Sequence, residues 1–191
     1  MKKAFLVLGI FVTLAVTLLS AQTTANNPAL NPILNHFGAR DYATTSVTRA
    51  ELDLIIQAGI RAPSAGNRQA WHFTVVQNLD LARRVAPNQV SEGNALIVVS
   101  ATGANRTTNA AILDCALAVQ SMYLAAQAMG LGSRIYTGPV SNINTNLRPA
   151  LGLTNEHNVV AVIRVGRLPA GVDAVSMASP RNSAERTVNY R

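Results

Sequence analysis

The chain has 191 residues, a formal net charge of +7, 49% hydrophobic residues and 13% charged residues. This length corresponds to one domain at roughly 150 residues per domain, and the composition excludes an intrinsically disordered chain. Lys2 and Lys3 are the only lysines, which excludes a Walker phosphate loop and lysine Schiff-base chemistry in the rest of the chain. The single cysteine, Cys115, excludes an intrachain disulfide and a multi-thiolate metal site.

The N-terminus has the three-part pattern of a secretory signal peptide. The two lysines precede an apolar stretch over residues 4–19, and small residues follow it. We therefore expect residues 1–21 to be a signal peptide that directs the protein to the periplasm or the exterior, with an uncleaved anchor as the alternative. Cleavage would remove two lysines and lower the net charge from +7 to +5. Residues 22–35 predict a flexible lead-in, and residues 36–191 the folded domain.

Local patterns predict two main helices and four strands. The capping box Thr48-Arg49-Ala50-Glu51 begins a helix that ends before Pro63. The alanine-rich residues 109–129 predict a long helix that Gly130 ends with a left-handed cap. Runs of β-branched and aromatic residues predict strands at 71–77, 95–101, 133–137 and 158–166. This order predicts an α/β chain, an α+β sandwich around one mixed central sheet.

Several other site types find little support in the sequence. His36, His72 and His157 lack the spacing of a zinc site. Gly130 follows a helix, whereas a dinucleotide-binding glycine motif follows a strand. The arginines are scattered and aromatic residues make up only 5%, so no nucleic-acid partner is expected. Cys115 lies among apolar helical residues, which indicates a buried, inert thiol.

The loop between the first helix and the first strand, residues 61–71, consists of small and amide residues. Small residues would let the backbone approach a planar ligand. Asn67 and Gln69 carry both hydrogen-bond donors and acceptors, which suits the imide edge of such a ligand. An ordinary turn is the alternative interpretation.

Four segments together resemble the nitroreductase family of FMN-dependent oxidoreductases. They are APSAGNRQAWHF at 62–73, DCALAVQSMYLAAQAMGLG at 114–132, NVVAVIRVGRLPAG at 158–171 and Ser-Pro-Arg at 179–181. They occur in the family's order and span roughly residues 36–188. The resemblance implies an interlocked homodimer with FMN in the groove between the chains, and a dimer interface formed largely by the long helix.

The resemblance also implies a set of cofactor-binding residues. Pro63, Ser64 and Ala65 would line the flavin ring, and Asn67 would lie on its substrate side. Arg40 would belong to the N-terminal binding motif, and Arg181 would bind the phosphate. The full implied set is Arg40, Pro63, Ser64, Ala65, Asn67, Gln69, Asn88, Thr137, Gly138 and Arg181. Among these, the amides of Thr137 and Gly138 would face the flavin N5 and O4.

The implied activity needs no catalytic side chain, because hydride or electron transfer occurs at flavin N5. The electron donor would be NADH, NADPH or another reductant, and the acceptor a nitroaromatic, a quinone or another conjugated molecule. After cleavage of the signal peptide no membrane partner is expected.

The sequence departs from the family pattern at three places. His36 and Gly38 stand where the family has an arginine and a serine, and the segment Asn88–Val90 carries no basic residue where the family often has one. Asn88 would supply a neutral donor instead. Ala70 replaces a proline before the tryptophan. Two alternatives therefore stay open: a non-catalytic protein that binds or scavenges flavin, and a flavin-free dimeric family member.

Overall fold

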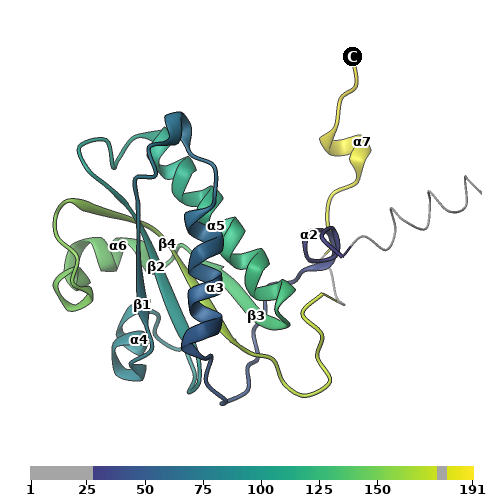
Figure 1. The fold of residues 1–191 in the computed structure, drawn as a ribbon, viewed down its shortest axis with the longest axis horizontal. Coiled ribbons are helices and arrows are strands. Elements are labelled where there is room, and N and C mark those ends of the chain that lie inside the picture. The colour runs from purple at the N-terminus through teal and green to yellow at the C-terminus, as the bar shows by residue number, and fades with distance from the viewer. Residues whose placement is uncertain (1–27, 176–179) are drawn as a thin grey trace, which may run out of the picture.

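The computed structural model describes residues 28–175 and 180–191, so the expected signal peptide lies outside the described residues. One four-stranded sheet forms the centre of the domain, with strand order β1-β2-β4-β3 (Figure 1). The strands are β1 (Trp71–Val76), β2 (Ala95–Thr102), β3 (Leu131–Tyr136) and β4 (His157–Arg167). All four strands were predicted, and their ends differ from the predicted ones by two residues at most.

The α+β class is confirmed, with one correction to the sheet. Every pairing between the described strands is antiparallel, whereas the alternation of helices and strands had predicted a mixed sheet. β2 and β3 do run in the same direction, as expected for strands joined by a helix. They are not neighbours, however, because β4 inserts between them and pairs antiparallel with both.

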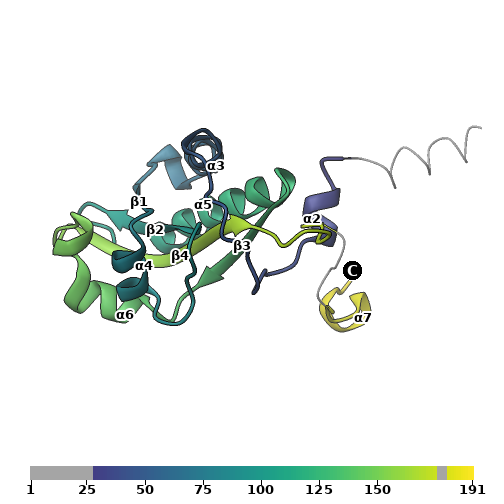
Figure 2. The same ribbon diagram turned by 90° about the horizontal axis from the view of Figure 1, so that it is seen from below.

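Two helices cover one face of the sheet. Helix α3 (Arg49–Ile60) begins at the predicted capping box, in which the Glu51 N–H donates to Thr48 Oγ1 at 3.3 Å and the Thr48 N–H donates to Glu51 Oε2 at 2.8 Å. Helix α5 (Asn109–Ala128) is followed by Gly130 at φ +74°, which confirms the left-handed cap. Figure 2 shows both helices on the same side of the sheet. Their apolar residues and one face of the sheet form the larger core.

The opposite face carries shorter elements that the sequence patterns did not predict. Helix α4 (Leu79–Val85) and the turns from α6 (Val140–Asn142) through Ile143–Leu147 and Pro149–Leu151 bury a second core there. Helix α2 (Asn31–Asn35) lies within the segment expected to be a flexible lead-in and has a proline in its first turn. Helix α7 (Ala184–Thr187) lies near the C-terminus.

Among the described residues, α5 alone is long and apolar enough to cross a membrane. Its buried side chains include the polar Asp114 and Gln127, which both make hydrogen bonds inside the domain. This is the pattern of a core helix.

The segment before α3, residues 37–43, lies across the ends of β3 and β4. The Ala39 N–H donates to Ser133 O at 3.1 Å, and the Ala43 N–H donates to Arg167 O at 2.9 Å. The Tyr42 ring packs over Gly132 and Gly166, which are register partners on β3 and β4. A Cβ on Gly166 would lie 2.5 Å from Tyr42 Cδ1. The glycine pair therefore lets this segment reach the sheet.

Gly166→Ala should lower the free energy of unfolding by about 1–3 kcal/mol, because the new methyl group overpacks the Tyr42 ring. Chemical denaturation monitored by circular dichroism measures this. The matched control is Gly138→Ala, since a Cβ at Gly138 meets nothing within 4 Å. Equal stability of the two variants would show that the close approach of Tyr42 does not constrain the fold.

Candidate functional site

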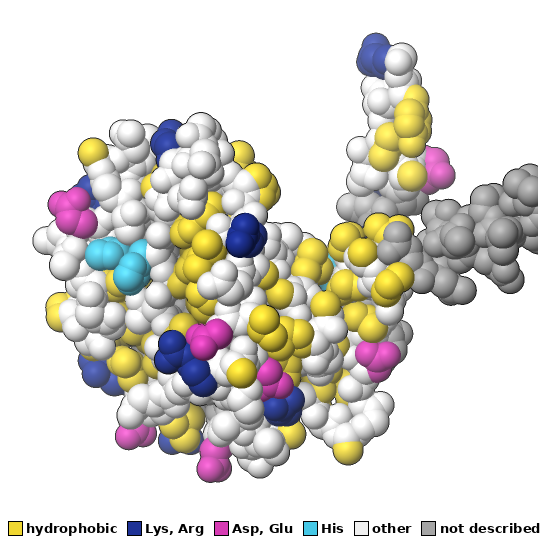
Figure 3. Space-filling view, in the orientation of Figure 1, with side chains coloured by type: hydrophobic (Ala, Val, Ile, Leu, Met, Phe, Trp, Pro, Cys, Tyr) yellow, Lys and Arg dark blue, Asp and Glu magenta, His cyan; other side chains and the backbone are white. Residues whose placement is uncertain are grey.

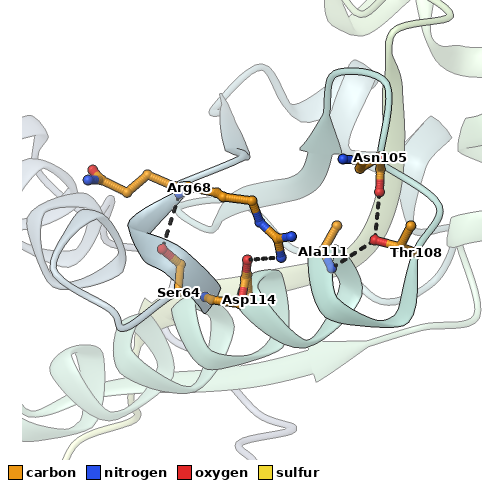
Figure 4. A network of polar contacts seen from close by, with 8 residues as sticks. Ser64, Arg68, Asn105, Thr108, Ala111 and Asp114 are labelled. Carbon is orange, nitrogen blue, oxygen red and sulfur yellow. Dashed lines mark hydrogen bonds and ion pairs between the residues drawn. The ribbon is translucent and has the colours of Figure 1, made fainter.

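The loop at residues 63–69 is attached to the first half of α5 by one carboxylate. The Ala65 N–H donates to Asp114 Oδ1 at 2.9 Å, and Arg68 Nη2 donates to Asp114 Oδ2 at 3.2 Å (Figure 4). The Gln69 N–H donates to Ser64 Oγ at 3.1 Å within the loop. The Asp114 side chain is only 2% exposed. Sequence analysis missed this role, although an acid in an otherwise apolar helix was a usable signal.

Backbone strain marks three of the residues predicted to bind the cofactor. Asn67, Gln69 and Asn88 have φ values of 52°, 51° and 58°, and they are the only non-glycine residues with positive φ in the described parts of the chain. Left-handed conformations of this kind are uncommon outside glycine and concentrate at functional sites. The Gln69 Nε2 donates to Asn67 Oδ1 at 3.0 Å, so the two strained residues of the loop are also joined by their side chains.

A second cluster lies at the other end of the domain, beside β3. His36, Gly38, Arg40, Tyr123 and Arg134 line a cavity of about 430 Å³. The His36 ring meets the Tyr123 ring edge to face, with centroids 5.3 Å apart. A Cβ at Gly38 would lie 3.9 Å from Arg134 Cγ. The cluster thus brings two guanidinium groups and an imidazole to one cavity, and Arg134 is a member that sequence analysis did not identify.

Arg181 acts on the same cluster. Burial raises the pKa of Tyr123, and the positive charges of Arg181 and Arg134 act to lower it. The charge of Arg181, the predicted phosphate ligand, therefore lies close enough to Tyr123 to act on it together with Arg134.

Two further cavities continue this cluster along β3. Arg40 also lines a cavity of about 310 Å³ with Asn88 and Arg164, and Arg134 lines one of about 530 Å³ with Tyr136 and Gly138. Thr137 immediately follows β3, and its carbonyl accepts from the Val140 N–H at 3.1 Å. We call these three neighbouring cavities, which share Arg40, Arg134 and Gln89 as lining residues, the β3 groove. It is lined by His36, Gly38, Arg40, Asn88, Arg134, Gly138 and Arg164.

The loop at 63–69 and the β3 groove lie far apart within one chain. The loop is held at Asp114, whereas Gln127 Nε2 donates to Phe37 O at 2.9 Å and so holds the segment that leads into the groove. These two positions on α5 are about 20 Å apart at 1.5 Å per helical residue. The loop at 63–69 is therefore held in the first half of α5, and the segment that carries Arg40 is held near its end. An isoalloxazine ring cannot contact both ends of a single chain.

The thiol of Cys115 is buried and does not line either part of this candidate site. Cys115 is fully buried, and burial, followed by the charge of Asp114, raises its pKa to about 12. The burial expected for this cysteine is confirmed, and its lack of reactivity stays a prediction.

In the native protein, Cys115 should not react with a thiol reagent at pH 8 but should react fully in denaturant. The raised pKa stabilises the fold fully below the pKa of the unfolded thiol, near 9, and this contribution is lost as the pH rises toward about 12. The unfolding free energy should fall more steeply between pH 9 and 11 than in Cys115→Ala. Rapid labelling of the native thiol would contradict this.

Asp114→Ala should destabilise the protein by about 1–3 kcal/mol, because it leaves the Ala65 N–H without its acceptor and Arg68 without its partner. Asp114→Asn, which keeps one acceptor, should cost less. Hydrogen exchange at the Ala65 amide should accelerate in the same order. Asp53→Ala is the control, since its pair with Arg49 at 2.7 Å is exposed and should contribute about 1 kcal/mol or less. An unchanged exchange rate in Asp114→Ala would refute the anchoring role.

The fold defines an α+β domain of the nitroreductase type. A nitroreductase family model matches residues 35–98 and 89–167, and the chain belongs to the nitroreductase family. A protein of Archaeoglobus fulgidus, named as a candidate NADH dehydrogenase/NAD(P)H nitroreductase, is 28% identical over 146 residues, which are 72% of this chain and 83% of the relative.

Solved structures support the same assignment. A protein from Desulfovibrio desulfuricans in complex with FMN, named as a candidate nitroreductase, has a TM-score of 0.73 and 28% identity, covering 87% of this chain and 98% of its own. A protein from Parabacteroides distasonis, named as a candidate NADH dehydrogenase/NAD(P)H nitroreductase, has a TM-score of 0.72 and 27% identity, covering 86% and 98%.

Proposed function

We propose that this oxidoreductase of the nitroreductase family binds FMN between two copies of the chain. The observation that carries the proposal is the separation of the loop at 63–69 from the segment that carries Arg40, since their two anchors on α5 are about 20 Å apart. The β3 groove of one copy would hold the phosphate and one edge of the flavin, and the loop at 63–69 of the other copy would complete the ring site. The FMN-bound relative from Desulfovibrio desulfuricans supports the choice of cofactor.

The side chains of the groove fit FMN chemically. A phosphate dianion is best bound by guanidinium groups, which offer paired donors, and Arg40, Arg134 and the charge of Arg181 gather around Tyr123. Gly138 leaves open space, since a Cβ there would meet no atom within 4 Å. In the opposite copy, Pro63 and Ala65 present small surfaces suited to a flat ring.

Exposed apolar side chains on α5 suit its proposed place in a dimer interface. Ile112, Leu113 and Leu117 are 38%, 59% and 36% exposed, and Leu54 on α3 is 61% exposed. Figure 3 shows hydrophobic side chains gathered over the region of α3 and α5. Contiguous exposed apolar surface of this kind is typical of an interface between protein chains.

When bound, FMN supplies the capacity to accept and pass on electrons or a hydride at its N5. The chain's own residues bind the phosphate, stack on the ring and exclude water. We propose NADH or NADPH as donor, in keeping with the names of the relatives, and nitroaromatics, quinones or other conjugated molecules as acceptors. Donor and acceptor would use the same groove in turn, which gives ping-pong kinetics.

Protein purified from Gln22 onward should retain about one FMN per chain after dialysis, and NADH or NADPH should bleach its absorbance. Bleaching that reverses with a quinone or nitroaromatic supports the oxidoreductase. Stable flavin that no donor bleaches would indicate a flavin-binding protein without turnover. A colourless protein that releases added FMN would indicate the flavin-free alternative and a decisive effect of His36 and Gly38.

Arg181→Met should weaken FMN binding about tenfold or more and leave riboflavin binding unchanged, because only FMN carries the phosphate. Fluorescence titration with both flavins measures this. Arg186→Met removes an equal charge from the same C-terminal segment and is the matched control. Equal losses for both flavins, or for both variants, would contradict the assignment of Arg181 to the phosphate.

We also propose that residues 1–21 direct export of the protein, on the strength of the lysine-apolar-small pattern alone. N-terminal sequencing of the protein from the periplasm or medium should begin near Gln22. Full-length protein retained in the cytoplasm would contradict export.

A further inference from the structure

Arg164 on β4 is a buried cation held without an acid. Its residue is only 6% exposed, and among the described residues no carboxylate lies within ion-pair distance of it. Its Nε donates to Asn94 Oδ1 at 2.7 Å, and its Nη2 donates to Ser91 Oγ at 3.1 Å. Its guanidinium carbon lies 3.9 Å from the centroid of the Tyr42 ring. Neutral groups alone thus hold this side chain in a fixed position.

The cavity that Arg164 lines holds one acid, Asp41, beside the cation Arg40, and the strand next to Arg164 adds further positive charge. Arg164 and Arg134 are direct register partners on β4 and β3, and like charges placed opposite each other on a sheet are destabilising. Burial raises the pKa of Tyr42 above its usual value, so the ring that packs against Arg164 is neutral. A buried charge without an opposite charge beside it lowers the free energy of unfolding by several kcal/mol. A ligand with an electron-rich edge would offset that cost.

The guanidinium also borders the segment Asn88–Val90, which carries no basic residue of its own. Arg164 lines the same cavity as Asn88, Gln89 and Val90, and its contact with Ser91 Oγ places it directly beside that segment. Two of its five N–H groups are committed, to Asn94 and Ser91. The others are available to a group that enters the cavity.

We propose that Arg164 is the residue that receives the electron-rich oxygen edge of the ligand in the β3 groove. This inference rests on the proposed function, under which that edge is the pyrimidine edge of FMN. Arg164 on β4 then supplies the positive charge that the segment Asn88–Val90 lacks. Positive charge near the N1 and C2 carbonyl of a flavin stabilises its reduced form. Arg164 therefore sets both ring affinity and reduction potential in this chain.

The test compares Arg164→Met and Arg164→Lys with wild type, and uses Arg49→Met, which removes an exposed charge, as the control. Arg164→Met should unfold at the same or a higher temperature, because an apolar side chain replaces an uncompensated buried charge. Its affinity for riboflavin and for FMN should fall together, by about tenfold. Arg164→Lys should recover part of the affinity.

The reduction potential of bound FMN gives a readout independent of turnover. In Arg164→Met the affinity for reduced FMN should fall about tenfold more than that for oxidised FMN, which lowers the two-electron potential by about 30 mV. Arg49→Met should leave the potential unchanged.

Three results would overturn the inference. A lower unfolding temperature with unchanged riboflavin affinity and potential would make Arg164 a structural residue only. A loss confined to FMN, with riboflavin unaffected, would assign Arg164 to the phosphate and not to the ring. Wild-type protein that binds neither flavin would refute the proposed function itself, and this inference with it.

Discussion

The close approach of residues 37–43 to the paired glycines of β3 and β4 is the constraint on which the β3 groove depends. Because Gly132 and Gly166 face each other in register, the Tyr42 ring can pack directly on the sheet. That ring in turn packs against the Arg164 guanidinium. The same docking carries Arg40 to the groove. Because these two positions are glycines, cationic side chains from widely separated parts of the sequence, Arg40 and Arg164, come together at the groove.

Helix α5 sets the distance between the two parts of the site. Asp114 in its first half holds the loop at 63–69, and Gln127 near its end holds Phe37. Both are buried polar side chains that hydrogen-bond to a backbone atom of another segment, so each one fixes a segment. Asp114 also accepts from the Arg68 side chain, whereas Gln127 Oε1 has no hydrogen-bond partner among the described residues. The exposed apolar residues Ile112, Leu113 and Leu117 lie in the first half of the helix, around Asp114. A single helix therefore orients both half-sites and, in our proposal, joins the copies.

The sequence predicted what depends on local patterns. The Thr48 capping box, the four strands and the Gly130 cap each follow from a few neighbouring residues, and the loop motif identified two of the strained residues, Asn67 and Gln69. Helix α4 was missed because its two turns are too short for a clear periodicity. Arg134, Arg164 and the anchoring role of Asp114 were missed because they depend on strand register and on contacts between distant segments. The mixed sheet was wrong because the insertion of β4 between β2 and β3 has no local signal.

The most direct test of the shared site is subunit complementation. One copy carries Arg134→Glu in the groove, and the other carries Ala65→Trp in the loop, with different tags for purification of the mixed dimer. Each variant alone should bind no FMN, whereas the mixed dimer should recover one intact site and bind about one FMN per two chains. A mixed dimer that binds none, or a variant that alone binds one FMN per chain, would contradict a site shared between two copies.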